Sequence, residues 1–439
     1  MKVTSLLKTP DGKLHRGWLI FAGLCLANFA LYQTGFNSLF ALPLANALGV
    51  TRGAIMFFTT VYAFGAAIAS VMFGALYSNP KIPVRVSMTI GVILSLCSYL
   101  LWAYAQNLFM VYAAGFLIPF SMQGIKIIGN SVFAVNWFDK SIRGKLIGVS
   151  SCFQGLGGMA MPVIIQLIIN AFGFQAGYWF LIAVTVVLVL PFTLFVFERT
   201  PQDVGLLPLG YREGKSDERE KTANLYGMTL KQSMKTIAFW AMLIIVFAIG
   251  MQNGFKSNFS GIALEGLGGM MGEEDVAMVA AIMVSIASGT DFVANLLIGA
   301  VTDKIGPMKA AFAGLTIFLL FFVILLLFEN QIWAFYIAAA CFGFNGCLLR
   351  TPIPLTIREL FGNKHFGSIW GVCNAIKPWT AGVMATCIAF AYDLSGTYSG
   401  ILIFGMIMAA IIYILYFVAT RFVGKYDWGQ PKGETSTLS

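Results

Sequence analysis

Charged residues are scarce in this sequence of 439 residues. Asp, Glu, Lys and Arg make up 11% of it, whereas a soluble domain carries about 25%. Nineteen acids and 28 bases cannot solvate the surface of a soluble chain of this length. The 58% hydrophobic content excludes intrinsic disorder, and the net charge of +9 has no basic face that would bind nucleic acid. The composition indicates a protein folded in lipid.

Residues that bind metals or perform catalysis are also few. The sequence has two histidines, His15 and His365, and seven cysteines with no CxxC pair. These numbers and spacings exclude a zinc or haem site and a disulfide framework. No nucleophile–base pair is visible in the sequence. We therefore predict that the protein has no cofactor or metal and is not an enzyme.

Long apolar runs are abundant. A membrane-spanning helix needs about 20 predominantly apolar residues, and twelve such runs lie between polar breaks. Several exceed this length, which indicates tilt or continuation into water. We predict an all-α membrane protein with twelve transmembrane helices, at 17–46, 52–78, 84–105, 107–137, 144–172, 176–197, 236–264, 275–301, 308–328, 331–360, 366–391 and 397–421.

One substantial polar insert divides the chain. Residues 198–235 carry thirteen charges, so we predict six-helix bundles at 1–197 and 236–439, joined by this segment as a cytoplasmic linker. With both termini in the cytoplasm, cytoplasmic segments hold 23 Lys and Arg, and the outer loops hold one, Arg52. This asymmetry predicts a multi-pass protein of the inner (plasma) membrane with both ends inside.

The two predicted bundles resemble each other in sequence. Gln33–Phe40 matches Gln252–Phe259 at an offset of 219, and Gln123-Gly124 matches Asn345-Gly346 at an offset of 222. Since each repeat has an even number of helices, the two are parallel, related by an axis along the membrane normal. Transporters built from such repeats bind substrate near the midplane between them.

A loop motif resembles a signature of the major facilitator superfamily, G-x-x-x-D-K/R-x-G-x-x-K/R. It begins at Gly299 and continues through Asp303, Lys304, Gly306 and Lys309. In the family this loop lies between the eighth and ninth helices. The resemblance implies the major facilitator fold and a cytoplasmic latch that holds two helix ends together in one access state.

Further segments resemble the oxalate/formate antiporter and monocarboxylate transporter branch of that superfamily. They are Asn136-Trp137-Phe138 followed by Arg143-Gly144, the run Thr200–Pro208, and Tyr392–Tyr398. Asp291 and Gly299 also match the D-x-x-x-R-P-x-x-G of monocarboxylate transporters, where the Asp is implied to carry a proton. Asn295 stands where that motif has its Arg. The resemblance implies transport of a mono- or dicarboxylate.

Five charges fall inside predicted spans. Four are cations (Lys126, Lys256, Arg350 and Lys377) and one is an anion, Asp291. Each costs roughly 2.5–3.5 kcal/mol near a helix centre, so they are expected to face the protein interior or water. The cationic surplus predicts an anionic substrate. Asp291 would either carry a proton or neutralise a lysine of the empty site.

Amide side chains accompany these charges at helical spacing. Gln252 lies four residues before Lys256, and Asn374 lies three before Lys377. We expect these amides to bond the polar groups of the substrate, held between Lys256 and either Arg350 or Lys377, and Lys126 is a further predicted substrate-binding residue. The predicted amide ligands are Gln33, Asn37, Gln252, Asn295 and Asn374.

The sequence therefore predicts a secondary active transporter of a small organic anion, working by alternating access as a proton symporter or an anion exchanger. We expect a monomer in the lipid bilayer with no nucleic-acid partner. Two alternatives stay open: an exporter of amphipathic drugs or lipids, and a membrane sensor that does not transport. Arg350 also precedes Pro352 and Pro354, and proline removes a backbone donor, so we expect its helix to kink there.

Overall fold

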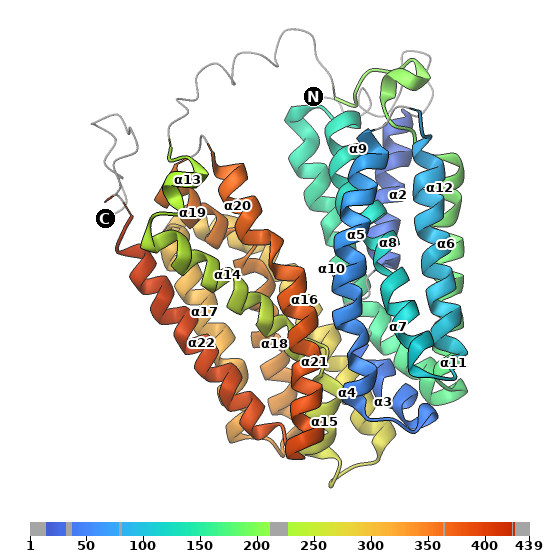
Figure 1. Cartoon of the computed structure of the whole chain (residues 1–439), viewed down its shortest axis with the longest axis vertical. Coiled ribbons are helices and arrows are strands. Elements are labelled where there is room, and N and C mark those ends of the chain that lie inside the picture. The colour runs from blue at the N-terminus through green and yellow to red at the C-terminus, as the bar shows by residue number, and fades with distance from the viewer. Residues whose placement is uncertain are drawn as a thin grey trace. The chain divides into compact units, whose positions relative to one another are not determined.

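The computed structural model describes residues 15–31, 37–78, 81–210, 227–362, 365–423 and 425. Their regular elements are helices (Figure 1). Ten of these helices are long and apolar enough to cross a membrane, and a shorter apolar helix covers Arg16–Ala30. Since lipid offers no hydrogen bonds, spanning segments must pair their backbone internally, as helices do. The protein is an all-helical, multi-pass membrane protein.

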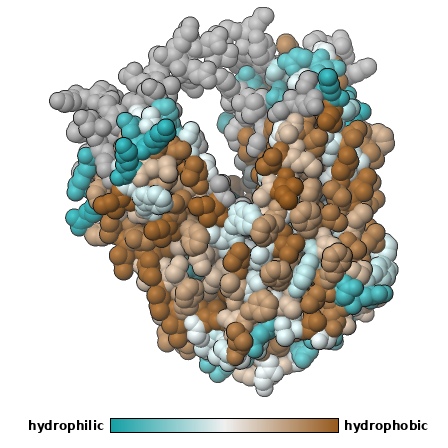
Figure 2. All heavy atoms as spheres, viewed as in Figure 1, coloured by the Kyte–Doolittle hydropathy of each residue, from teal (hydrophilic) through white to brown (hydrophobic). Residues whose placement is uncertain are grey.

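The described residues form two compact units. Unit 1 comprises those within 1–50 and 57–222, and unit 2 comprises those within 51–56 and 223–439. In the view of Figure 2, hydrophobic residues cover the middle of each unit and hydrophilic residues gather toward its ends. This distribution is that of a chain whose sides face lipid.

Unit 1 has its core among α2, α5, α6 and the helices that follow them. Phe73, Phe133 and Trp137 are fully buried there. The order is α2 (Arg16–Ala30), α3 (Asn37–Leu48), α5 (Phe58–Ser78), α6 (Val84–Ala103), α7 (Leu108–Leu117), α8 (Pro119–Ser121), the π-helix η1 (Met122–Gly129), α9 (Asn130–Trp137), α10 (Lys140–Phe172), α11 (Phe174–Leu188), α12 (Leu190–Phe195) and the 3₁₀ turn η2 (Pro201–Val204).

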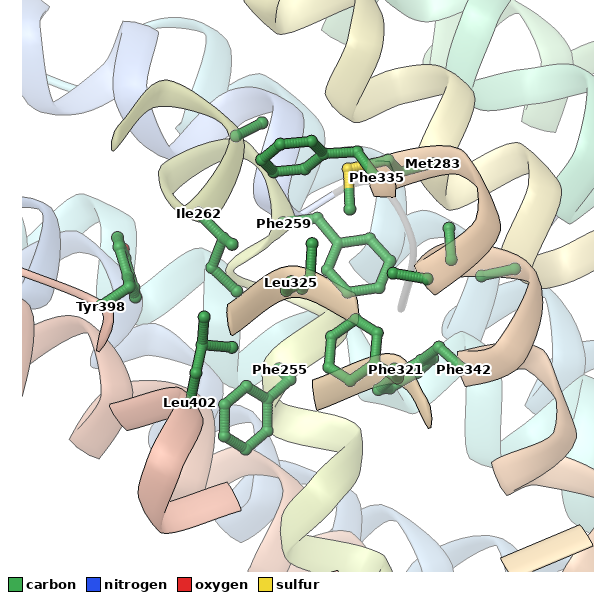
Figure 3. Close-up of a cluster of buried hydrophobic side chains, with 14 of the residues drawn as sticks. Phe255, Phe259, Ile262, Met283, Phe321, Leu325, Phe335, Phe342, Tyr398 and Leu402 are labelled. Carbon is green, nitrogen blue, oxygen red and sulfur yellow. The ribbon is translucent and has the colours of Figure 1, made fainter. Parts of the chain in front are cut away.

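Unit 2 has a phenylalanine-rich core (Figure 3). The rings of Phe259 and Phe342 pack edge to face with centroids 5.2 Å apart. Its order is α4 (Arg52–Met56), α13 (Leu230–Ser233), α14 (Ile237–Lys256), α15 (Phe259–Leu267), α16 (Glu273–Ile305), α17 (Pro307–Leu327), α18 (Ile332–Leu348), α19 (Pro352–Phe361), α20 (Phe366–Ala375), α21 (Lys377–Ser395) and α22 (Ser399–Thr420).

Several expected spans are divided within the described residues. The span expected at 17–46 is not among them: it includes α2 and α3, and its residues 32–36 lie outside the described part of the chain. The span expected at 331–360 is divided into α18 and α19, which confirms the kink expected before Pro352. The span expected at 366–391 corresponds to α20 and α21. These breaks fall close to the polar residues predicted to form the site.

The polar insert is anchored at both of its described ends. The backbone N–H of Leu209 donates to Trp137 O at 2.8 Å within unit 1. The N–H of Met228 donates to Phe361 O at 2.9 Å within unit 2. Between these anchors, residues 211–226 of the predicted linker lie outside the described residues.

Candidate functional site: a charged cluster on helix α16

One face of α16 carries Ser288, Asp291 and Asn295. Their spacing of three and four residues places them on one side of a helix. Oδ2 of Asp291 accepts a hydrogen bond from Nη1 of Arg350 at 3.1 Å, which is also an ion pair. Its Oδ1 accepts a bond from Nδ2 of Asn295 at 2.9 Å. The carboxylate is therefore held by a cation on one oxygen and an amide on the other.

Arg350 lies in the break between α18 and α19. Helix α18 ends at Leu348, and α19 begins at Pro352. Proline is tolerated at this first helical position because its missing N–H would have no intrahelical partner there. The break allows the Arg350 side chain to leave the helix path and reach Asp291, 59 residues away in sequence.

Lys256 is the second cation on this face of α16. It is the last residue of α14, and its ammonium donates to Ser288 Oγ at 2.9 Å. Ser288 Oγ donates in turn to Val284 O at 2.7 Å, which orients the hydroxyl. Because α16 rises about 1.5 Å per residue, the positions that hold Lys256 and Arg350 are about one turn apart. The formal charges of Lys256, Arg350 and Asp291 sum to +1.

The Asp291–Arg350 pair lies at an accessible position. The Arg350 side chain is 46% exposed, and that of Asp291 is 25% exposed. Gly346 makes their approach possible, since a Cβ atom at that position would overlap the Asp291 carboxylate. Ion pairs with this exposure are weaker than sealed ones. An anion that reaches Arg350 can therefore compete with Asp291 for the guanidinium.

Lys126 belongs to unit 1, within the π-helix η1. π-Helical turns are rare and frequently occur at functional sites. The Tyr77 hydroxyl donates to Gly124 O at 2.7 Å, which satisfies a carbonyl inside this turn. Gln123, three residues before Lys126, is buried. The structure thus places Lys126 on an irregular helical segment.

The predicted amides divide into two groups. Gln252 is buried and donates to Gly405 O at 3.0 Å, so its nitrogen joins α14 to α22. Asn37 is half-buried at the start of α3. Gln33 lies outside the described residues, and so do the side chains of Asn374 and Lys377. The described cluster therefore brings together Lys256, Asp291, Asn295 and Arg350 from the predicted set.

The predicted latch forms the turn between α16 and α17. Gly306 has a φ of +82°, which side chains other than glycine rarely adopt. Lys304 and Lys309 flank it and are exposed, while the Asp303 side chain lies outside the described residues. The positive φ of Gly306 explains why the motif has a glycine at this position.

Two contributors were missed by the sequence predictions. Ser288 holds Lys256, and Gly346 admits the Asp291 carboxylate. The spacing that linked Asp291 to Asn295 extends three residues back to Ser288 and could have found it. The partner of Asp291 also differs from the expected lysine, because Arg350 occupies that place. No local pattern indicated the role of Gly346.

A multi-pass helical bundle with paired charges inside its spans is typical of membrane proteins that move ions or substrates. The comparison with protein families makes the class specific. The profile described as Major Facilitator Superfamily matches residues 24–271 and 271–439. The chain belongs to the major facilitator superfamily and is a transporter, not an enzyme.

Individual relatives agree with this assignment. The chain is 24% identical over 368 residues to "Uncharacterized MFS-type transporter YhjX" of Escherichia coli (strain K12), covering 83% of this chain and 85% of the relative. It is also 24% identical over 314 residues to "MFS-type transporter pytF" of Aspergillus terreus, covering 68% of this chain and 92% of the relative.

Solved transporters share the fold at low sequence identity. A POT family transporter in complex with 5-aminolevulinic acid matches with a TM-score of 0.69 at 12% identity, covering 95% of this chain and 98% of that one. The nucleoside transporter NupG matches with a TM-score of 0.69 at 10% identity, covering 93% and 100%. Proteins of this fold thus bind chemically different substrates.

Proposed function

We propose that the protein moves a small organic anion, a mono- or dicarboxylate, across the membrane by alternating access. The observation that carries this proposal is the arrangement on α16. Arg350 and Lys256 are held about one turn apart, with Asp291 as the carboxylate among them. A substrate carboxylate offers Arg350 the same planar pair of oxygens as Asp291, and arginine binds such groups with two parallel bonds.

The topology proposed for this function has twelve spans in two parallel repeats. Residues 1–197 and 236–439 are the six-helix bundles, and 198–235 is the cytoplasmic linker. Both termini face the cytoplasm, and the protein resides in the inner (plasma) membrane as a monomer. The asymmetry of Lys and Arg supports this orientation. The turn at Gly306, with Asp303, Lys304 and Lys309, is the proposed cytoplasmic latch.

Asp291 has two candidate roles in coupling. In the first, it is a resident counterion of Arg350, and the substrate displaces it. The substrate and Asp291 then compete for one cation, which gives exchange without a proton. In the second, protonation of Asp291 releases Arg350 for the anion, which gives symport of a proton and an anion. The ion pair to Arg350 supports both roles, since either one frees the guanidinium.

Binding would extend to the other predicted groups. Lys377, Lys126, Gln33, Asn37, Gln252 and Asn374 are proposed as further ligands. Asn295, which bonds Asp291 here, would turn to the substrate once Asp291 is displaced. The resemblance to the oxalate/formate antiporter and monocarboxylate transporter branch favours a carboxylate.

Uptake into proteoliposomes tests the proposal. A panel of radiolabelled mono-, di- and aromatic carboxylates identifies cargo, and Arg350→Ala is expected to lower its uptake about 100-fold, because a lost charged contact costs 2–5 kcal/mol. The matched control is Arg85→Ala, which removes an arginine whose ion-pair partner is Glu198 in unit 1. Normal uptake by both Arg350→Ala and Lys377→Ala would exclude this site.

The same assay separates the alternatives. An exporter of amphipathic compounds would keep its activity when single cations are removed. A membrane sensor would bind a carboxylate in a thermal-shift screen and show no flux. To separate the two roles of Asp291, Asp291→Asn should abolish dependence on a proton gradient and spare exchange if Asp291 carries the proton. Loss of both activities would make the pair structural.

A further inference from the structure

Arg52 is the single base of the predicted outer loops, yet its side chain is buried. It begins α4 and is only 8% exposed. Its Nη1 donates to the Tyr398 hydroxyl at 2.8 Å, and its Nη2 donates to Ser260 Oγ at 2.9 Å. Although the sequence places Arg52 in an outer loop, its guanidinium is enclosed by residues from α15 and the start of α22.

Unit 2 has room for this guanidinium beside Gly261. A Cβ atom at Gly261 would overlap both the Arg52 guanidinium and the Tyr398 hydroxyl. Glu265 fixes the acceptor, since its carboxylate accepts from the Tyr398 N–H and from Thr397 Oγ1, each at 2.6 Å. Figure 3 shows Tyr398 beside Ile262 and Leu402, at the edge of the phenylalanine-rich core. The Tyr398 residue is therefore held in place, and the Arg52 guanidinium occupies the space that a side chain at position 261 would fill.

Two backbone contacts hold the rest of the segment. The Gly53 N–H donates to Asp393 Oδ2 at 2.9 Å, and Thr386 Oγ1 donates to Met56 O at 3.0 Å. Residues 51–56 therefore group with unit 2, although the chain continues as α5 in unit 1. The helix is interrupted at Phe57, between α4 and α5. One short segment is held by the C-terminal unit while the helix it starts belongs to the N-terminal unit.

The bonds that hold Arg52 are suited to release. Both of its acceptors are hydroxyl oxygens, and its buried Nε has no acceptor among the described residues. A buried guanidinium without a carboxylate loses hydration that neutral acceptors restore only in part. Release returns the guanidinium to water, and this hydration offsets part of the lost bonds. A sealed ion pair would have favoured one state strongly.

We propose that residues 51–56, here called the clasp, close the outer end of the transport path. The side chain of Arg52 holds the clasp in its closed position and can be released. The clasp is closed when Arg52 is bound to Tyr398 and Ser260, and the outward-open state requires Arg52 to withdraw and the chain to bend at Phe57. This inference rests on alternating access and the orientation proposed above, and it is independent of the cargo's charge.

Cysteine trapping and external labelling test the clasp without any cargo. The background replaces the seven native cysteines and adds Asn295→Cys as a reporter on the face of α16 that holds the site. A membrane-impermeant maleimide is applied from outside. Gly53→Cys with Asp393→Cys is designed to form a disulfide that keeps the clasp closed. The two positions are close enough for this bond, because a Cβ at Gly53 would overlap the Asp393 carboxylate. Oxidation should suppress labelling of Cys-substituted position 295, and a reductant should restore it.

Arg52→Ala is the complementary variant and should raise external labelling more than tenfold, since it removes two hydrogen bonds and one bond to a charged group shifts an equilibrium by roughly tenfold. Arg421→Ala is the matched control, because Arg421 stacks on Phe417 at the other end of α22. If Arg52→Ala does not fold, Tyr398→Phe removes only the acceptor oxygen and should show a smaller rise. Labelling within twofold of the background in the foldable Arg52 or Tyr398 variant overturns the clasp, as does a locked pair that leaves labelling unchanged. Failure of the carboxylate screen would leave this result intact.

Discussion

The helical segments that carry Lys126 and Arg350 occupy corresponding positions in the two sequence repeats, and both depart from a regular α-helix. In unit 2 the departure is a break at 349–351, followed by Pro352. In unit 1 it is the π-helix η1, where the Tyr77 hydroxyl bonds a carbonyl within the turn. The same position is therefore irregular in both units, as a break before a proline in one and as a π-helix in the other.

The charges of the two segments also differ. Arg350 meets a carboxylate of its own unit, Asp291. The predicted spans of the first repeat contain no Asp or Glu, as the sequence from 12 to 138 and from 140 to 197 shows. Both segments are thus irregular, whereas an ion pair with a carboxylate inside a span occurs in the second half, since the spans predicted for the first half contain no acid.

The largest expected difference between the two units concerns a pair of glycine substitutions. Gly346→Ala places a methyl group against the Asp291 carboxylate, whereas Gly124→Ala, its equivalent in unit 1, meets the buried Phe73 ring at 2.6 Å. Each should destabilise the protein by about 1–3 kcal/mol through overpacking, measured by thermal unfolding in detergent. Adding Asp291→Ala should relieve the defect of Gly346→Ala and leave that of Gly124→Ala unchanged. Equal behaviour of the two glycines would contradict the difference between the units.

A double-mutant cycle measures which cation is coupled to Asp291. Asp291→Asn and Arg350→Ala should show a coupling of about 1–2 kcal/mol in unfolding, lower than for a sealed pair because Arg350 is 46% exposed. Asp291→Asn with Lys126→Ala is expected to be additive, since the ion-pair partner of Asp291 is Arg350 of its own unit. Coupling of Asp291 to Lys126 of the same size would refute the assignment of Asp291 to Arg350.

The smallest expected effect concerns the starts of α2 and α14, the first helices of the two repeats. His15 caps α2, with Nδ1 accepting from the Gly17 N–H at 3.0 Å and Nε2 bonded to Leu207 O at 3.1 Å. Thr236 caps α14, and a hydroxyl has no charge to gain at these pH values. Burial lowers the pKa of His15 below its ordinary 6.5, against a smaller opposing effect of the Leu207 bond.

A lowered histidine pKa means that the folded protein binds fewer protons than the unfolded chain. The stability from this cap is therefore fully present above pH 6.5 and declines as the pH falls below it. His365→Gln leaves His15 as the single imidazole, so that its titration can be followed by NMR and is expected to have a midpoint under 6.5. A midpoint at or above that value would show that the cap does not favour the neutral ring.

The extent of prediction from sequence differs between the fold and the site. Apolar runs located most spans, because a helix in lipid must be long and apolar wherever it lies in the bundle. The prolines after Arg350 also located the break. The Ser288 contact was within reach of the same helical spacing. Gln252 was predicted as a ligand from its spacing to Lys256, and the bond of its nitrogen to Gly405 O between two helices is a contact that this spacing does not indicate.

Composition and order of residues were sufficient to indicate a helical, multi-pass membrane protein, and they predicted a duplicated plan with charges inside its spans. Tertiary structure alone decided which charges meet. Arg350 reaches Asp291 across 59 residues, and Arg52 reaches Tyr398 across 346. Both contacts need a close approach between elements at a glycine, Gly346 or Gly261. The physical reason is that helix formation follows from neighbouring residues, whereas charge pairing depends on how distant helices pack.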